Sequence, residues 1–75
     1  MSKNPHDGAS RLKARYRAML DFIESAQERH TKEVEGYMLN EFGVTPETTQ
    51  KYLLWAEQYG QIKFLNPARN RVKRI

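Results

Sequence analysis

The stretch GVTPETTQKYLLWAEQYGQIKF, residues 43–64, carries one start signal and two stop signals for helices. Gly43 is the residue type that ends a helix in the left-handed conformation. Thr45 followed by Pro46 indicates a new helix, because threonine caps an N-terminus and proline is tolerated at the first helical position. Gly60 supplies the second stop. We therefore expect one helix from Thr45 to about Tyr59.

Apolar residues at three- and four-residue spacing predict two earlier helices. The first is expected to run from a Ser10 cap to about Glu28, and the second from a Thr31 cap to the Gly43 stop. The apolar positions of the first are Leu12, Tyr16, Met19, Leu20, Ile23 and Ala26, and those of the second are Val34, Tyr37, Met38 and Phe42.

The residues after Gly60 resemble a β-hairpin. Ile62 and Phe64 alternate with polar residues as in a half-buried strand, residues 66–70 have turn composition, and residues 71–75 can pair back. The predicted fold class is α+β, mostly α, with three helices and a C-terminal β-hairpin. It is expected to form one domain over residues 10–75, after a flexible N-terminal arm over residues 1–9.

Composition excludes several classes of protein. The 75 residues contain no cysteine, so a disulfide framework and a thiolate zinc site are both ruled out. The sequence shows no signal peptide and no apolar run long enough to span a membrane, which favours a cytoplasmic protein with no membrane partner. His6 and His30 lack a second ligand at metal spacing, and no catalytic motif is present. We therefore expect no enzymatic activity, cofactor, metal or small-molecule ligand.

Charge is unevenly distributed along the chain, whose net charge is +4. Residues 1–17 hold five basic residues and one acid, residues 18–62 hold three basic residues and eight acids, and residues 63–75 hold five basic residues and no acid. Two basic ends around an acidic middle indicate which surfaces would meet a polyanion.

Two helices joined by a short turn that contains glycine form a helix-turn-helix arrangement. Residues 43–64 resemble the recognition-helix segment of winged helix-turn-helix regulators such as the GntR and MarR families. The resemblance extends more loosely over residues 10–75, and two positions depart from it: Thr49 replaces an aliphatic residue and Leu39 replaces a small one. The matching positions are Thr45, Thr48, Leu53, Ala56, Gly60 and Ile62.

The resemblance implies that the third helix enters the major groove of double-stranded DNA and reads its sequence, as in a small transcription regulator. Such a protein would be nucleoid-associated. Gln50 could pair with an adenine edge, Lys51 could contact a phosphate or a guanine, and Glu47 could accept from a cytosine amino group. The candidate recognition residues are Thr45, Glu47, Thr48, Gln50 and Lys51.

The basic ends supply two further candidate DNA contacts. The hairpin would act as a wing on the DNA backbone or minor groove, with a solvated basic surface as the alternative. Arg11 and Arg15 of the first helix would contact the DNA backbone, with a membrane-surface helix as the alternative. The candidate wing residues are Lys63, Arg69, Arg71, Lys73 and Arg74.

Leu54 and Trp55 are apolar where the related families carry polar residues. They either pack within the chain or form an interface, and a homodimer would suit a two-fold DNA site. Two other functions remain open from the sequence. One is a winged-helix protein-interaction module of replication or transcription machinery, and the other is an RNA-binding protein of a virus or plasmid system.

Overall fold

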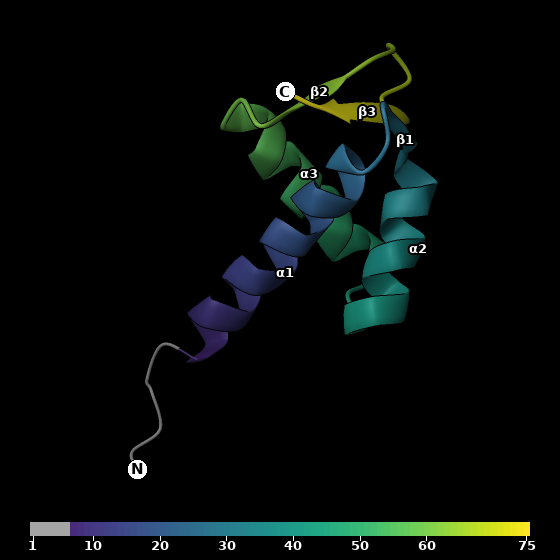
Figure 1. Cartoon of the computed structure of the whole chain (residues 1–75). Helices are drawn as coiled ribbons and strands as arrows, with labels where there is room; N and C mark the ends of the chain where they lie inside the picture. Colours follow the sequence, from purple (N-terminus) through teal and green to yellow (C-terminus); the bar gives the residue numbers. More distant parts are fainter. Residues whose placement is uncertain (1–6) are drawn as a thin grey trace.

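The computed structural model describes residues 7–75, with side chains from residue 11 onward, and confirms a mostly helical α+β domain. The chain forms three helices and a small three-stranded antiparallel sheet, whose first strand lies between the first two helices in sequence (Figure 1). In chain order the elements are α1 (Asp7–Glu24), β1 (Arg29–His30), α2 (Thr31–Phe42), α3 (Pro46–Gln58), β2 (Ile62–Phe64) and β3 (Arg71–Arg74).

The first helix begins earlier and ends earlier than its sequence predicts. It includes residues 7–9 of the expected arm, and the rest of that arm, residues 1–6, lies outside the described residues. It ends at Glu24 rather than Glu28, where side chains take up the carbonyl of Phe22. Ser25 Oγ donates to that carbonyl at 2.6 Å and Arg29 Nε donates to it at 3.1 Å. These contacts turn the chain toward β1.

The ends of α2 and α3 follow local capping chemistry. His30, and not Thr31, caps α2: its Nδ1 accepts the Lys32 N–H at 3.0 Å, and its own N–H donates to the Glu33 carboxylate at 2.8 Å. Gly43 ends α2 in the left-handed conformation, with φ of 68°. Thr45 caps α3 by accepting the Thr48 N–H at 3.3 Å. The predicted turn at residues 43–45 is therefore confirmed.

The sheet contains a strand that the sequence analysis missed. The strand order is β1-β3-β2, so β3 pairs with both neighbours. Val72 lies opposite Arg29 on one side and Phe64 on the other. Because β1 has only two residues, it has no periodicity by which a sequence could reveal it.

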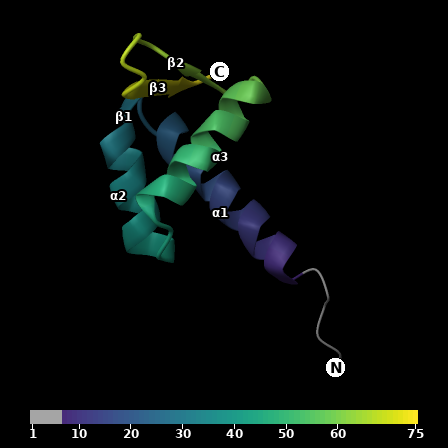
Figure 2. The same ribbon diagram turned by 180° about the vertical axis from the view of Figure 1, so that it is seen from behind.

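The core lies where the three helices meet beneath the sheet. Its buried apolar residues are Met19, Leu20, Ile23, Val34, Met38, Val44, Tyr52, Leu53, Ala56, Ile62 and Val72. Seen from behind in Figure 2, α3 crosses in front of α1 and its C-terminal end meets the hairpin.

The two departures from the family pattern have different structural consequences. Thr49 is fully buried on α3, and its hydroxyl has no hydrogen-bond partner. The position is therefore as buried as the aliphatic residue of the family pattern would be, but it carries a polar group. An unpaired buried hydroxyl reduces stability. Leu39 is half-exposed, so its larger side chain does not separate α2 from α3.

One glycine inside α2 and one at its C-terminal cap allow the same substitution to be tested with opposite expected signs. Gly36 lies inside the helix and Gly43 has a positive φ, and neither would bring a new Cβ within 4 Å of another atom. Gly36→Ala should raise the free energy of unfolding by about 0.5–1 kcal/mol through helix propensity. Gly43→Ala should lower it by about 1 kcal/mol through left-handed strain. Urea denaturation of both variants checks this, and equal shifts would contradict the turn assignment.

Candidate nucleic-acid interface

The predicted recognition residues lie at the N-terminal half of α3, but two of them are used by the helix itself. Thr45 and Thr48 are linked by a 3.1 Å hydroxyl hydrogen bond beside the backbone cap. Glu47, Gln50 and Lys51 are exposed. The hydroxyl of Thr45 serves the cap although its side chain is exposed, so Glu47, Gln50 and Lys51 are the side chains whose polar groups take no part in the cap.

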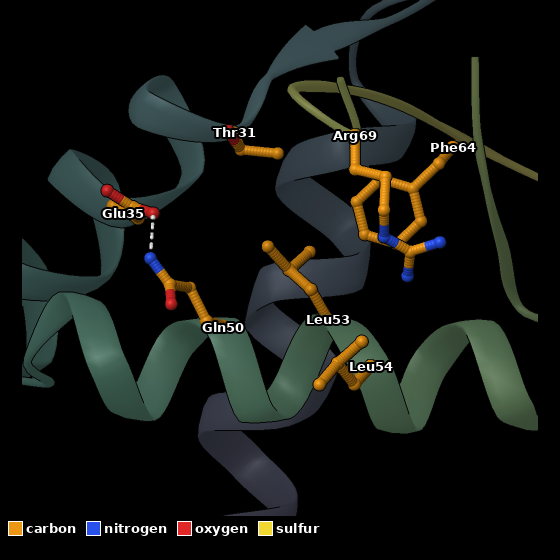
Figure 3. Close-up of a pocket in the computed structure, with 7 residues that line it drawn as sticks. All are labelled: Thr31, Glu35, Gln50, Leu53, Leu54, Phe64 and Arg69. Carbon is orange, nitrogen blue, oxygen red and sulfur yellow. Dashed lines mark hydrogen bonds between the residues drawn. The ribbon is translucent and has the colours of Figure 1, made fainter. Parts of the chain in front are cut away.

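Gln50 lies at the edge of a hollow between α2, α3 and the hairpin (Figure 3). The hollow encloses about 220 Å³, with Leu53, Leu54 and Phe64 as apolar lining and Glu35, Gln50, Thr31 and Arg69 as polar lining. Gln50 Nε2 donates to Glu35 Oε2 at 3.2 Å. An external group that binds Gln50 would have to replace Glu35 as its hydrogen-bond partner, and both of these side chains lie at the surface.

The Arg69 side chain remains exposed, but it lies against α3 rather than extending from the hairpin. Its guanidinium lies 4.2 Å from the centre of the Phe64 ring and forms an ion pair with Glu57 of α3 at 2.6 Å. The residue adopts a φ of 58°, which few residues other than glycine do. The structure therefore gives Arg69 an internal role, fastening the hairpin turn to the last turn of α3.

The hairpin cations fall into two groups. Arg71 Nη1 lies 3.7 Å from Glu28 Oε1, and Arg74 Nε lies 3.5 Å from Glu24 Oε1, so acids near the end of α1 neutralise both arginines. Glu57 neutralises Arg69 in the same way. Lys63 and Lys73 are exposed and form no ion pair with any side chain of residues 11–75. Charge counted along the sequence could not show this division, because the neutralising acids come from α1, from the segment after it and from α3.

Lys63 and Lys73 lie directly opposite each other in the pairing of β2 with β3. Directly opposed residues of an antiparallel pair project from the same face of the sheet, and Val72 next to them points into the core. The two ammonium groups therefore share the face of the hairpin that is turned away from the core.

The cations of α1 are not part of the same surface. Arg11 and Arg15 lie on the N-terminal half of α1, which projects away from the sheet in both Figure 1 and Figure 2. The structure therefore places the two basic ends, both of which the sequence analysis assigned to DNA contact, on separate parts of the molecule.

Leu54 and Trp55 also separate, although they are adjacent in sequence. Leu54 is half-exposed and lines the hollow of Figure 3. Trp55 lines a second hollow, together with Leu12, Tyr59, Lys13 and Tyr16. The sequence signal for this second group was a four-residue spacing, which separates Trp55 from Tyr59 and Leu12 from Tyr16. The sequence analysis did not connect these two pairs with each other.

Tyr16 anchors α1 beside this second hollow. Its hydroxyl donates to Gln61 Oε1 in the connection between α3 and β2, and its ring meets Tyr52 edge-on at 6.2 Å. Burial, with a smaller contribution from Tyr59, raises the pKa of Tyr16 above its ordinary value. A tyrosine hydroxyl is already protonated at neutral pH, and the raised pKa keeps it a donor to higher pH.

No family model, curated protein or solved structure matches this chain. None of the helices within residues 7–75 is long and apolar enough to cross a membrane.

The link between Arg69 and Glu57 can be measured by a double-mutant cycle. Arg69→Ala, Glu57→Ala and the double variant should give a coupling energy of about 0.2–1 kcal/mol, because both side chains are partly exposed. Arg69→Ala alone should cost more than Glu57→Ala, since it also loses the contact with Phe64.

Urea denaturation at low and high salt provides the measurement, and the coupling should shrink at high salt. Arg71→Ala is the matched control, because its ion pair is longer, and it should cost less than Arg69→Ala. A coupling energy of zero would show that Arg69 does not fasten the hairpin turn.

Proposed function

We propose that this chain is a winged helix-turn-helix domain that binds double-stranded DNA. The order helix, strand, helix, helix, hairpin supports the proposal, as does the turn of residues 43–45 that joins α2 to α3. In this proposal α3 is the recognition helix, and β2 with β3 forms the wing. The resemblance of residues 43–64 to winged helix-turn-helix regulators supports the same class.

The opposed lysines Lys63 and Lys73 are the observation that carries the proposal. Like charges directly opposite each other destabilise a strand pair. The three hairpin arginines have carboxylate partners, whereas these two lysines have none among the described side chains. A phosphate oxygen bound between the two ammonium groups would relieve their repulsion, and duplex DNA presents phosphates at regular spacing.

The exposed end of α3 supplies the groups that would read bases. Lys51 adds a cation, while Gln50 and Glu47 offer hydrogen-bonding groups suited to adenine and cytosine edges. Gln50 must leave Glu35 to do so, which costs little because both side chains lie at the surface. We therefore assign affinity to the lysines and sequence discrimination to Gln50 and Glu47, as expected of a small transcription regulator.

A salt titration of DNA binding by fluorescence anisotropy tests this assignment. Lys63→Ala with Lys73→Ala should weaken binding to every duplex and lower the salt slope by about one unit per lost phosphate contact. Gln50→Ala should cost roughly 1–3 kcal/mol on a preferred site and little on random duplex.

Arg71→Ala with Arg74→Ala is the matched control, since it removes the same charge from the same hairpin. It should lower the salt slope less than the lysine variant does, because both arginines already have carboxylate partners. Equal losses from the two double variants would remove the lysine pair as the contact. Failure of the wild-type protein to bind any duplex, or tighter binding to single strands or duplex RNA, would overturn the proposed function.

A further inference from the structure

A second hollow lies between the projecting half of α1 and the C-terminal half of α3, and the proposed DNA contacts do not use it. It encloses about 290 Å³ and is lined by Leu12, Lys13, Tyr16, Trp55 and Tyr59. Four of these five side chains are apolar or aromatic, yet Leu12 and Trp55 are each 39% exposed and Tyr59 is 74% exposed. We call this surface the α1/α3 groove.

The groove exists because the apolar stripe of α1 is longer than the core that covers it. Met19 and Ile23 of that stripe are fully buried against the other elements. Residues three or four positions apart lie on one face of a helix, so Tyr16 and Leu12 continue the same stripe toward the N-terminus. The core ends before it reaches Leu12, and the stripe is left open to an external partner.

Basic side chains flank the stripe on both sides. Helical spacing places Arg11 and Arg15 along one flank and Lys13 and Arg17 along the other. Residues 11–20 contain no acid, and none of these four cations forms an ion pair with a side chain of residues 11–75.

The α3 wall of the groove adds one more cation. Lys51 precedes Trp55 by one turn on the same side of α3, and the nearest acid on that side is Glu47, two turns away from Trp55. The groove is therefore apolar along its length and positively charged at its edges.

This pattern selects among the possible occupants. A second copy of the chain placed by two-fold symmetry would bring four cations of one α1 close to four cations of the other, which repel. A carboxylate-bearing partner meets the opposite situation, because its charges complement the edges while its apolar residues cover Leu12, Trp55 and Tyr59. An amphipathic helix laid in a groove makes both contacts at once.

We propose that the α1/α3 groove binds an amphipathic helix of a partner protein whose apolar stripe is flanked by glutamates or aspartates. Leu54 and Gln50 lie on the other side of α3, and the groove shares no lining residue with the hollow of Figure 3. The partner helix and DNA would thus occupy different hollows, and Lys51, which lines neither hollow, is the one residue of α3 that both proposals use. The inference does not depend on the proposed DNA binding, and either can fail without the other.

Trp55 provides the readout, because it is the only tryptophan of the chain and lies in the groove. The probe is a synthetic helical peptide of about 18 residues, with leucines on one face and glutamates on both flanks, long enough to hold several turns. Its addition should shift the Trp55 emission to shorter wavelength and reach saturation, as apolar side chains cover the indole. Two control peptides are used. The first has the same leucines and glutamates in an order that forms no apolar face, and the second has lysines in place of the glutamates.

Charge reversal on one flank of α1 tests the basic edge. Lys13→Glu with Arg17→Glu should weaken binding of the acidic peptide about tenfold or more, and should improve binding of the lysine peptide. Lys63→Glu with Lys73→Glu is the matched control on the hairpin and should leave peptide affinity unchanged. Both double variants alter exposed residues and keep Trp55, and thermal unfolding confirms that each variant folds.

Several results would overturn the inference. The first is the absence of a saturable emission shift with the acidic peptide, and the second is equal binding of either control peptide to the wild-type protein. A shift that depends on protein concentration alone, with a dimer in sedimentation, would assign the groove to a second copy. A shift with anionic phospholipid vesicles and none with the peptide would assign it to a membrane surface.

Discussion

The central position of β3 in the sheet is the constraint on which the rest of the structure depends. Val72 is fully buried and pairs with a residue on each side, so β3 connects the segment after α1 to the segment after α3. The two residues of β1 could not form a strand by themselves and owe their conformation to this pairing. Pairing with β1 fixes where α1 ends, and the position of α1 determines how much of its apolar stripe lies beyond the core.

Three of the eight acids in the middle of the sequence neutralise hairpin arginines. Carboxylates of Glu24, Glu28 and Glu57 each meet one hairpin arginine. Exposed ion pairs of this kind contribute little stability, but they decide which cations remain open to a polyanion. The result is a separation of roles that the net charge of the chain conceals. The arginines hold the hairpin to the helices, and Lys63 and Lys73 face solvent as a pair.

Local chemistry made the helix boundaries around residues 43–60 predictable, because Gly43, Thr45 and Pro46 act through their own backbone preferences. Apolar periodicity likewise predicted the three helices and the hairpin. The sequence analysis missed β1, because that strand depends on pairing with the distant β3. It also started α1 at Ser10 rather than Asp7 and placed the cap of α2 at Thr31, one residue after the actual cap. His30 is both the N-cap of α2 and the last residue of β1, where it pairs with Arg71 of β3.

The candidate site was less predictable than the fold, for the same physical reason. Arg69 was predicted to contact DNA as a wing residue, but its guanidinium packs on the Phe64 ring and pairs with Glu57 of α3. Leu54 and Trp55 were considered one surface, yet a helix turns by about 100° per residue, which places them in separate hollows. Adjacent residues of a helix point in different directions. The packing of the hairpin and of α1 against α3 shows that Leu54 lies beside the hairpin and Trp55 beside α1.

The central claim is that α3 separates two binding surfaces, one with the hairpin for duplex DNA and one with α1 for an acidic helix. Mapping amide chemical-shift changes by NMR during titration with a DNA duplex, and separately with the acidic peptide, tests it most directly. We expect the duplex to move the signals of Gln50, Lys51, Lys63 and Lys73, and the peptide to move those of Leu12, Tyr16, Trp55 and Tyr59. Duplex-induced changes concentrated on Leu12 and Trp55, with Lys63 and Lys73 unaffected, would contradict the account.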